Sequence, residues 1–517
     1  MAFATASVFS QTSTANHYAN NITAAGLKKH LSIIASDSLE GRETGMPGQK
    51  MAADYIEKQF KRFGLEKPKG MTGYQQIFPL RMDSVITSSL KINGEEAISG
   101  KDFLVPLNDN EAGDFYSSAI VFAGYGIDDN MYSDYTQLDV AGKMVLIFAG
   151  EPKRNGKYFI NTDGTASAWE NDLDQKLKTA AEKGAAGAMV VIPNMATFSK
   201  RMLGRNMKSG MYFNAIEHST TQKLHFFYAS HEYARKIIGE DWDALLQSAK
   251  NNKLLNELPK EVKTGINFKF EKYGGSLQSS NVIGVIEGTD KKDEYVFLTA
   301  HYDHLGKKDG VVYNGADDDG SGTVAVLQMA EAFAQAKKEG KGPRRTVVCM
   351  TVSGEEKGLW GSEYYSEHPV FDLGKTSVDL NTDMIGRIDT ERKSADTLNY
   401  VYVVGHDKIS SELPVINEKV NNETTQLTLD YKFDDPKDPQ RIYYRSDHYN
   451  FARKGVPVLF FYDGMLLSDY HQPTDDIEKI YWPVFEKRAR MIFLTAWEMA
   501  NRNDMLKRDK PLPTGTR

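Results

Sequence analysis

The chain has 517 residues, which is too long for one ordinary hydrophobic core and predicts at least two domains. Its 63 Lys and Arg residues against 70 Asp and Glu give a formal charge of -7, too balanced to favour a nucleic-acid partner. Hydrophobic residues make up 40% of the chain, enough for globular packing, yet no run approaches the roughly 20 apolar residues of a membrane span.

Residues 1–20 are predicted to form a terminal tail. They are rich in Ala, Ser and Thr and contain neither the basic n-region nor the apolar h-region of an export signal. We interpret Ala2 to Gln11 as the remainder of a trimmed signal. This interpretation slightly favours an exported protein, periplasmic or secreted, over a cytoplasmic one.

Two amphipathic helices are expected next, because apolar residues recur at helical spacing from Ala24 to Ser36 and from Gly48 to Phe63. Between them, residues 37–48 contain glycines and a proline, which mark an irregular surface loop. We assign residues 21–83 to the first part of a discontinuous domain.

A second domain, residues 84–275, is predicted to be β-rich and inserted into the first. Its predicted strands are Ser118 to Ala123, Lys143 to Phe148 and Ala188 to Ile192, with one helix from Lys176 to Lys183. Its end is predicted in the Lys-, Asn- and Glu-rich stretch from Lys250 and at a turn formed by Gly274 and Gly275.

Strands alternate with helices from Asn281 onward, which predicts an α/β fold with a mainly parallel central sheet flanked by helices. The predicted strands are Val282 to Ile286, Tyr295 to Ala300, Thr346 to Val352, Ser377 to Asp383, Tyr400 to Val404 and Val456 to Tyr462. Helices are expected from Ser321 to Lys337 and from Trp482 to Ala500. We assign residues 276–505 to this domain and residues 506–517 to a C-terminal tail.

Acids and histidines follow several of these strands, at the edge where ligands bind in open α/β sheets. The segments are His301 to His304, Ser353 to Glu356 and Asn381 to Asp383. A single histidine at a strand end is usually structural, but several such segments together favour a metal centre. Imidazole and carboxylate ligands, with one carboxylate as a bridge, suit two divalent ions about 3.5–4 Å apart, and zinc accepts this mixture.

Two runs of carboxylates predict a division of roles. Asp317, Asp318 and Asp319 precede a helix, and three consecutive acids exceed what helix capping requires, so one is expected to bridge metals beside His301. Adjacent side chains of an extended segment point to opposite sides. Glu355 and Glu356 are adjacent and follow a predicted strand. One of them is therefore expected to bind metal and the other to accept a proton from activated water.

Five motifs occur in a fixed order: His301-Tyr302-Asp303, Gly315 to Gly322, Gly354-Glu355-Glu356, Asn381 to Gly386, and Tyr470-His471. Together they resemble the motifs of peptidase family M28, a family of zinc aminopeptidases. The resemblance covers Leu27 to Leu65 and Asn281 to about Asn501, and it implies the zinc exopeptidase fold. One departure is Asp319, where the family often has Asn.

The resemblance implies two Zn²⁺ ions per chain. The implied ligands are the bridging Asp318, then His301 and Asp383 on one ion, and Glu356 and His471 on the other. Glu355 would be the general base, and Asp303 would hold the His301 ring by its distal nitrogen. The implied reaction is hydrolysis of the N-terminal residue from peptides with a free N-terminus.

Two further segments resemble known ones. Ser446, Asp447 and His448 match a family segment near the substrate cleft, although a helix cap is an alternative. The inserted domain is similar to a protease-associated domain, through Gly124 to Ile127, Asp139 to Ile147 and Ala180 to Gly187. Such an insert would cover the cleft, shape it or bind partners.

Three alternative functions stay open. A carboxypeptidase on the same fold would need a cation for the substrate's terminal carboxylate, for which Arg387, Arg441 and Arg445 are candidates. A glutaminyl-cyclase-like transferase would use one zinc, and a receptor-like module would be expected to lose ligands. Residue preference, set by loops such as Thr424 to Tyr444, and oligomeric state stay open as well.

Overall fold

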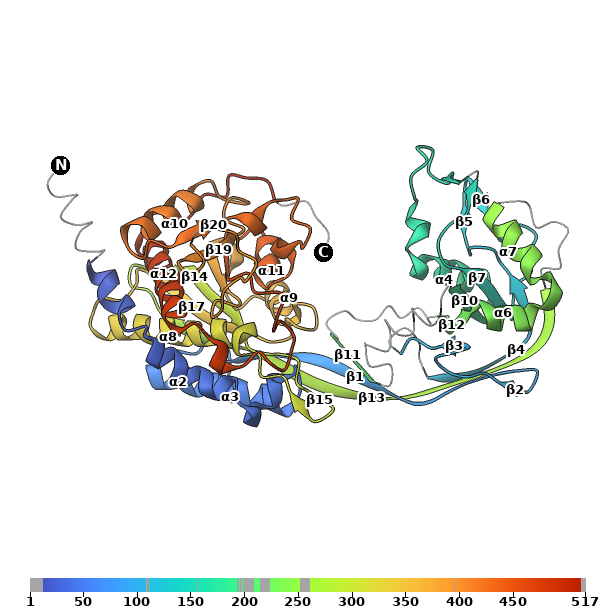
Figure 1. Ribbon diagram of the computed structural model, residues 1–517, viewed down its shortest axis with the longest axis horizontal. Helices are drawn as coiled ribbons and strands as arrows, with labels where there is room; N and C mark the ends of the chain where they lie inside the picture. Colours follow the sequence, from blue (N-terminus) through green and yellow to red (C-terminus); the bar gives the residue numbers. More distant parts are fainter. Residues whose placement is uncertain are drawn as a thin grey trace. The chain divides into compact units, whose positions relative to one another are not determined.

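The computed structural model describes residues 13–512 except 108–109, 111, 155, 193–194, 196–197, 199–208, 214–223, 252–260 and 395. The chain divides into two compact units (Figure 1). The discontinuous unit comprises Met1–Pro79 and Gln278–Arg517, and the inserted unit comprises Leu80–Leu277. The boundaries predicted from the sequence lie close to these divisions.

The discontinuous unit is built on a sheet with the strand order β20-β19-β21-β18-β14-β17-β13. The strands are β13 (Glu261–Ile286), β14 (Lys291–His301), β17 (Arg345–Val352), β18 (Thr376–Thr382), β19 (Tyr400–Val404), β20 (Thr428–Asp430) and β21 (Val458–Tyr462). β14 runs parallel to β17 and β18, and β18 runs parallel to β21. β13 and β19 are antiparallel to their partners β17 and β21. The predicted α/β fold with a mainly parallel sheet is confirmed.

Alternate residues of the central strands serve two different cores, as the two-residue period of a strand requires. In β14, Val296 and Leu298 pack into one core, and Phe297 packs into the other. The helices of the first core are α2 (Ala24–Ile34), α3 (Pro47–Phe63), α8 (Gly322–Lys338) and α12 (Trp482–Asn501), and α10 (Glu412–Glu423) packs on α12. The second core includes residues of α9 (Trp360–Glu367) and α11 (His448–Ala452). Helices therefore flank the sheet, as predicted, and Cys349 is buried within the first core.

Both predicted tails need correction within the described residues. Residues 13–19 are helical, and the side chain of Tyr18 is buried, stacks on Trp497 and donates a hydrogen bond from Oη to Glu339 Oε2 at 2.7 Å. At the other end, Leu506 is buried in the core, and Arg508 Nη2 donates to Thr376 O at 2.8 Å. Apolar packing thus extends into both segments. Residues 1–12 and 513–517 lie outside the described part.

The loop predicted at residues 37–48 begins with a 3₁₀ helix, Asp37–Arg42, that is kinked at Glu40 and Gly41. The side chain of Arg42 is fully buried and donates hydrogen bonds to the carbonyl oxygens of Tyr302, Asn314 and Gly315 at 2.6–2.9 Å. This arginine fixes two loops that carry predicted site residues.

Strand pairing continues from β13 into the inserted unit, in the order β13-β4-β7-β10-β12-β3. The strands β4 (Gly113–Phe122), β7 (Met144–Phe148), β10 (Gly187–Ile192) and β12 (Phe226–Ser230) are mutually parallel, whereas β3 (Phe103–Leu104) is antiparallel to β12. The unit contains α4 (Leu173–Glu182), near the predicted helix, and also α6 (His231–Ile238) and α7 (Trp242–Asn251). The prediction of a β-rich unit with one helix therefore missed two helices, whose buried Trp242 and Leu245 complete its core.

Shorter elements complete the description. They are β2 (Glu95–Glu96), β5 (Asp128–Asp129), β6 (Tyr132–Ser133), β8 (Lys153–Arg154), β9 (Lys157–Tyr158), β11 (Ser209–Phe213), β15 (Lys307–Lys308) and β16 (Val311–Val312). Most of these strands form two-residue hairpins at the surface.

Two long strands, β1 (Gln75–Ile92) and β13, contain the unit boundaries. The predicted turn at Gly274 and Gly275 is wrong, because both glycines lie inside β13. A Cβ at Gly274 would lie 2.8 Å from Asp83 Oδ1, so this glycine permits a close approach between strands. Asp83 in turn accepts from Lys272 Nζ at 2.8 Å. The stretch 252–260 lies outside the described residues.

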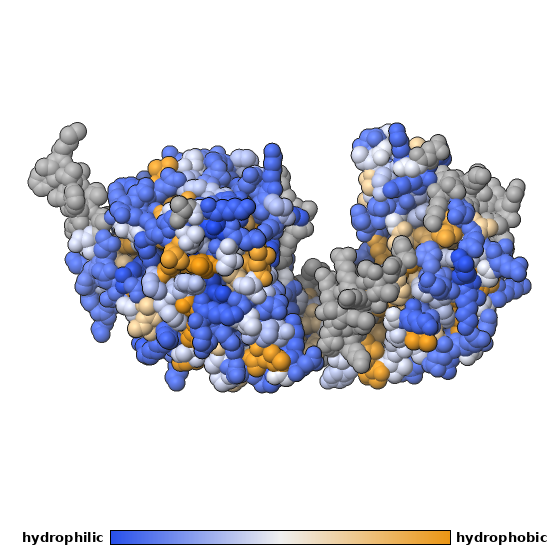
Figure 2. Space-filling model, viewed as in Figure 1, coloured by the Kyte–Doolittle hydropathy of each residue, from blue (hydrophilic) through white to orange (hydrophobic). Residues whose placement is uncertain are grey.

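Hydrophilic residues dominate the face of each unit shown in Figure 2. Large exposed apolar side chains, such as Ile86, Val415 and Leu467, occur singly, as is normal for a protein surface. In the described part of the chain, no helix has the length and apolar character needed to cross a bilayer.

Candidate metal centre

The site lies at the carboxyl edge of the central sheet, where three neighbouring strands end. β14 ends at His301, β17 leads to Glu355 and Glu356, and β18 leads to Asp383. Because parallel strands present the same end at one edge, these side chains come together. A short π-helical turn, Ala316–Ser321, adds the three aspartates.

Asp318 lies at the centre of the cluster. Its Oδ1 is 3.3 Å from Nε2 of His301, and its Oδ2 is 3.3 Å from Nε2 of His471. One carboxylate therefore faces a histidine through each of its two oxygens. This is the arrangement that a bridging ligand between two metal ions requires.

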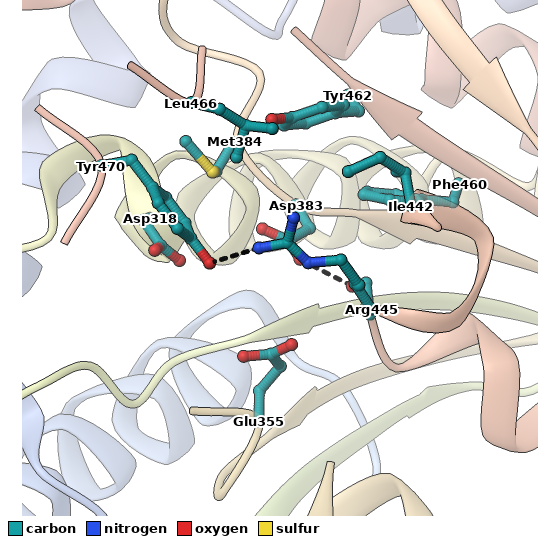
Figure 3. Close-up of a pocket in the computed structure, with 11 residues that line it drawn as sticks. Asp318, Glu355, Asp383, Met384, Ile442, Arg445, Phe460, Tyr462, Leu466 and Tyr470 are labelled. Atoms are coloured by element: carbon teal, nitrogen blue, oxygen red, sulfur yellow. Dashed lines mark hydrogen bonds between the residues drawn. The ribbon is translucent and has the colours of Figure 1, made fainter. Parts of the chain in front are cut away.

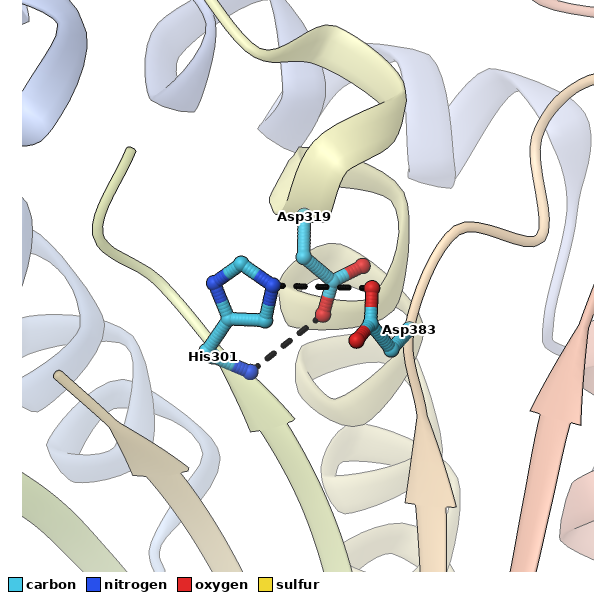
Figure 4. A group of neighbouring side chains, drawn as sticks. All are labelled: His301, Asp319 and Asp383. Carbon is cyan, nitrogen blue, oxygen red and sulfur yellow. Dashed lines mark hydrogen bonds and ion pairs between the residues drawn. The ribbon is translucent and has the colours of Figure 1, made fainter. Parts of the chain in front are cut away.

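The first half of the cluster contains His301 and Asp383, with Nε2 of the ring 3.5 Å from Oδ1 of the carboxylate (Figure 4). The His301 side chain is only 1% exposed. Its other nitrogen, Nδ1, is 3.1 Å from the carbonyl oxygen of Asp303 but 3.7 Å from the carboxylate of that residue. Asp303 thus contacts the distal nitrogen, as predicted, but does so through its backbone carbonyl.

The carboxylate of Asp303 has a different role from the predicted one. It accepts from Thr44 Oγ1 at 2.7 Å and from the backbone N–H of Glu355 at 3.3 Å. It therefore joins the segment after α2 to the segment after β17, and it helps to fix the position of Glu355.

The second half contains Glu356 and His471, with Glu356 Oε2 3.0 Å from His471 Nε2. The side chain of His471 is 35% exposed. His304, which was not among the predicted ligands, is fully buried here, with Nδ1 2.8 Å from Glu356 Oε1. The one sequence signal for His304 is its place in the His-Tyr-Asp-His segment after β14, three residues beyond His301.

Asp319 differs from Asp318 in how its oxygens are used. Its carboxylate accepts from the backbone N–H groups of His301, Gly322 and Met384 at 3.3, 2.7 and 3.0 Å. It therefore binds three backbone segments together, which leaves Asp318 as the aspartate whose two oxygens face histidines. The residues after His471 support the same turn, because Asp475 accepts from the backbone N–H groups of Asp317 and Asp318.

Gly315 permits the tight turn before these aspartates. Its φ is +53°, and a Cβ there would lie 2.3 Å from the carbonyl oxygen of Asp318 and 2.4 Å from the ring of His304. A side chain at this position would displace both residues, so the glycine is required for the close packing of the cluster.

The predicted cleft segment divides between two environments. Ser446 Oγ donates to Asp383 Oδ2 at 2.6 Å and accepts from Asn381 Nδ2 at 2.8 Å, so it contacts a predicted ligand directly. Asp447 is buried and accepts from Ser362 Oγ, and His448 is buried and stacks on Phe460. Asp447 and His448 therefore belong to the core behind the site.

The charges of the cluster favour a bound cation. Burial opposes charge on His301, but Asp383 and Glu355 raise the pKa of its ring well above the usual value. Burial likewise opposes charge on His471, yet hydrogen bonds to Asp318 and Glu356 raise its pKa to about 10. Burial raises the pKa of Glu355 well above its usual value, and Asp383 and Glu356 raise it further. In the metal-free cluster, the negative charge of the carboxylates therefore favours protonated histidines. Bound divalent ions would neutralise the same carboxylates in place of those protons.

Apart from these ion pairs within the cluster, several buried ring and carboxylate atoms lack a hydrogen-bond partner among the described residues. They are His301 Nε2, both ring nitrogens of His304, Asp318 Oδ2 and Glu356 Oε1. Buried polar atoms are normally satisfied, and these atoms converge on the same space. Nitrogen and carboxylate donors in this proportion fit Zn²⁺.

An open pocket of about 350 Å³ adjoins the cluster (Figure 3). Its acidic lining consists of Asp318, Glu355 and Asp383. The apolar and aromatic lining comprises Met384, Ile442, Phe460, Tyr462, Leu466 and Tyr470. Ser446 and Arg445 complete the lining, so Arg445 reaches the pocket whereas Arg387 and Arg441 do not. Ile442 belongs to the segment Thr424 to Tyr444, from which part of the pocket was expected.

A model of peptidase family M28 matches residues 281–496 of the chain. A probable glutamate carboxypeptidase of Arabidopsis thaliana is 36% identical over 119 residues, which cover 23% of this chain and 16% of that protein. A probable leucine aminopeptidase of Arthroderma otae is 27% identical over 241 residues, covering 46% of this chain and 62% of that protein. The chain therefore spans less than two thirds of the length of either relative.

Among solved structures, an aminopeptidase from Aneurinibacillus sp. strain AM-1 aligns with 97% of this chain and 98% of its own, with a TM-score of 0.55. The sequence identity is 17%, so this likeness shows the fold.

Proposed function

We propose that the chain, whose residues 281–496 match a model of peptidase family M28, is a zinc-dependent exopeptidase that removes N-terminal residues from peptides and binds two metal ions. The observation that carries this proposal is the position of Asp318, whose two oxygens each lie 3.3 Å from the ring of a different histidine. A carboxylate between two separate donor pairs suits a co-catalytic pair of ions better than a single ion.

The proposed ligands fall into two sets that share Asp318. His301 and Asp383 would hold one ion, and Glu356 and His471 would hold the other. When bound, the zinc ions would lower the pKa of a water molecule toward about 7 and polarise the scissile carbonyl group. The chain's own residues orient the peptide and move the proton.

Glu355 is the proposed general base. It lines the pocket, and its Oε2 lies 4.0 Å from Nε2 of His301. Burial raises the pKa of its carboxyl group well above the usual value, and Asp383 adds to the rise. A carboxylate with a raised pKa accepts a proton from water more readily and can return it to the leaving amine.

The acidic lining of the pocket favours an aminopeptidase. With Asp318 and Asp383 holding the ions, Glu355 is the lining carboxylate that keeps a negative charge for the α-ammonium group of a peptide. The name of the Arthroderma relative agrees with this mode, whereas the name of the Arabidopsis relative agrees with a carboxypeptidase. Paired assays with N-acetylated and C-amidated peptides separate the two, since an aminopeptidase cleaves only the peptides with a free amine.

The test of the mechanism is the substitution Glu355→Gln, which keeps size but removes the base. We expect kcat on an aminoacyl p-nitroanilide to fall on the order of 10²–10⁴-fold, with two zinc ions still bound by elemental analysis. Glu391→Gln, on an exposed side chain, is the matched control and should leave kcat unchanged. Near-normal hydrolysis by fully metal-loaded Glu355→Gln would sink the assignment of this base.

Metal stoichiometry tests the remaining alternatives. One tightly bound zinc ion per chain would favour a glutaminyl-cyclase-like transferase over a two-ion peptidase. No hydrolysis of any free-amine peptide by fully loaded protein would favour a carboxypeptidase or a receptor-like module.

We also propose that the inserted unit is a protease-associated-like domain and that the protein is exported. Four parallel strands and the motifs after β4, before β7 and around α4 support the first proposal. The second rests on the composition of residues 1–12, which lie outside the described part of the chain. Fractionation of the natural host, followed by immunoblotting for this chain, tests the location.

A further inference from the structure

Arg445 is the one cationic side chain, among the described residues, that lines the pocket beside Glu355. Its Nη2 donates a hydrogen bond to Tyr470 Oη at 3.0 Å, and its guanidinium carbon lies 5.7 Å from the centre of the Tyr470 ring. Figure 3 shows the guanidinium group directed across the pocket toward Tyr470. The tyrosine therefore orients the arginine without neutralising its charge.

Within the described part of the chain, Arg445 has no carboxylate within 4.0 Å. Two other arginines of this unit are paired with carboxylates: Arg387 Nη2 lies 2.8 Å from Asp469 Oδ2, and Arg345 Nε lies 2.6 Å from Glu294 Oε2. The difference is notable because Arg445 shares its pocket with three carboxylates. Those carboxylates face the histidines, so the guanidinium group keeps donors for a molecule that enters the pocket.

An arginine fork binds a carboxylate through two parallel hydrogen bonds, which makes it specific for this planar anion. The zinc-loaded pocket thus presents the free carboxylate of Glu355 to an ammonium group and one oriented guanidinium group to a carboxylate. A substrate with both charges near the scissile bond can contact both residues. A peptide without a nearby carboxylate can contact Glu355 alone.

We propose that Arg445 makes the enzyme selective for peptides with a carboxylate close to the scissile bond. This inference rests on the proposed exopeptidase function and deepens it by naming the substrate class. The carboxylate has two possible sources: the C-terminus of a dipeptide, or the acidic side chain of the N-terminal residue. Both present the same chemistry to the guanidinium group, and substrate pairs distinguish them.

The experiment compares kcat/KM for two matched pairs of substrates. Leu-Gly against Leu-Gly-amide tests the terminal carboxylate, and Glu-Gly-amide against Gln-Gly-amide tests the side chain. Hydrogen bonds to charged groups correspond to about tenfold to a hundredfold in a rate or equilibrium constant. We expect the wild-type enzyme to prefer the anionic member of one pair by about that factor.

Variants assign the preference to Arg445. Arg445→Gln should abolish the preference, because it lowers kcat/KM for the anionic substrate more than for its neutral partner, which has no carboxylate to bind. Arg445→Lys should restore part of the preference, since it keeps the charge but loses the fork. Arg441→Gln, on an exposed arginine of the same segment outside the pocket, is the matched control and should keep the wild-type preference.

A binding measurement separates this inference from the proposed function. Calorimetry on Glu355→Gln, loaded with zinc, should show tighter binding of the anionic member of the preferred pair, and adding Arg445→Gln should remove that difference. Arg445-dependent binding without turnover by the wild-type enzyme would refute the peptidase function and leave the inference standing.

Three outcomes would overturn the inference: equal kcat/KM within both wild-type pairs, an equal loss on neutral and anionic substrates in Arg445→Gln, or a preference that persists in that variant. Cleavage of N-acetylated peptides with a free C-terminus would also overturn it, because Arg445 would then bind the terminal carboxylate of a carboxypeptidase substrate.

Discussion

The two halves of the donor cluster differ in how firmly the protein holds them. His301 is 1% exposed, with Nδ1 fixed by the Asp303 carbonyl, and its partner Asp383 receives a hydrogen bond from Ser446. His471, in contrast, is 35% exposed, and it lies on a loop that follows β21. Its ring is stacked on Tyr470 with a centroid distance of 3.8 Å.

This difference teaches that the two proposed ions need not be equivalent. Ligands whose geometry is fixed by hydrogen bonds around them bind metal with less loss of side-chain freedom. We therefore expect the ion at His301 and Asp383 to bind more tightly, and the ion at Glu356 and His471 to exchange more readily.

The largest expected effect separates the two histidines. His301→Ala should lower kcat/KM on the order of 10³-fold, because it removes the ring nitrogen that faces both Asp318 and Asp383. His471→Ala should cost about tenfold less, since His304 Nδ1 lies 2.8 Å from Glu356 and can act as the replacement donor. Equal losses in the two variants would contradict the unequal halves. Zinc content, measured in parallel, and the exposed-site control His368→Gln complete the comparison.

A smaller effect is expected at Ser446, which orients Asp383 in the buried half. Ser446→Ala removes the 2.6 Å hydrogen bond to Asp383 Oδ2. Loss of such a partner typically costs about 10–100-fold in metal affinity or activity. Competition with a zinc-sensitive dye measures the affinity, and Ser411→Ala, whose hydroxyl donates to Asp509, is the control. Unchanged zinc affinity would show that Asp383 is held without this serine.

The rate at which a chelator removes zinc should also differ between the two halves of the cluster. We expect stepwise zinc release, with the first equivalent lost about tenfold faster than the second, because the half-exposed His471 side is open to solvent and chelator. In His471→Ala the fast phase should disappear, and in Ser446→Ala the slow phase should accelerate. Release of both ions in one phase would contradict a difference between the halves.

The smallest effect concerns acid stability behind the buried half. Burial lowers the pKa of His448 from 6.5 to about 3, so the folded protein keeps this ring neutral while the unfolded chain takes up a proton near pH 6.5. The contribution is complete above pH 6.5 and is lost progressively as the pH falls toward 3. Between pH 7.5 and 5.5 the free energy of unfolding should fall by about 1 kcal/mol from this residue.

Urea unfolding of wild type and His448→Phe at both pH values measures that contribution. The variant keeps an aromatic ring against Phe460 and should lose less stability than wild type on acidification. The exposed-site variant His368→Gln should behave as wild type. An identical pH response of His448→Phe and wild type would exclude His448 as a source of acid sensitivity.

Periodicity predicted the mainly parallel sheet because its strands are continuous buried runs with sharp ends, as in β17, where all the residues of Arg345–Val352 are buried. The same sharp ends located the segments of His301, Glu356 and Asp383. The residues that directly follow a strand lie at the edge of the sheet. They can therefore be identified from the local sequence, without knowledge of distant residues.

Other features depend on contacts between segments far apart in the chain. Nothing local distinguishes Arg445 from Arg441, since only the approach of Tyr470 brings the former into the pocket. A pair of adjacent glycines usually indicates a turn, but Gly274 lies inside β13. A glycine is needed there because the side chain of Asp83 approaches the backbone closely. His304 likewise acquires its importance from Glu356, which lies 52 positions later in the numbering.

The place of the inserted unit has a consequence for how the protein is made. α2 and α3 leave the ribosome before Leu80–Leu277, but the sheet on which they pack begins only after that unit. At roughly 5–20 residues per second, they wait on the order of 10–40 s with their apolar faces unpaired. The inserted unit has a core of its own and can fold during this interval. We therefore expect a nascent chain stopped near residue 290 to bind a holdase chaperone through α2 and α3, and a chain completed to residue 512 to release it.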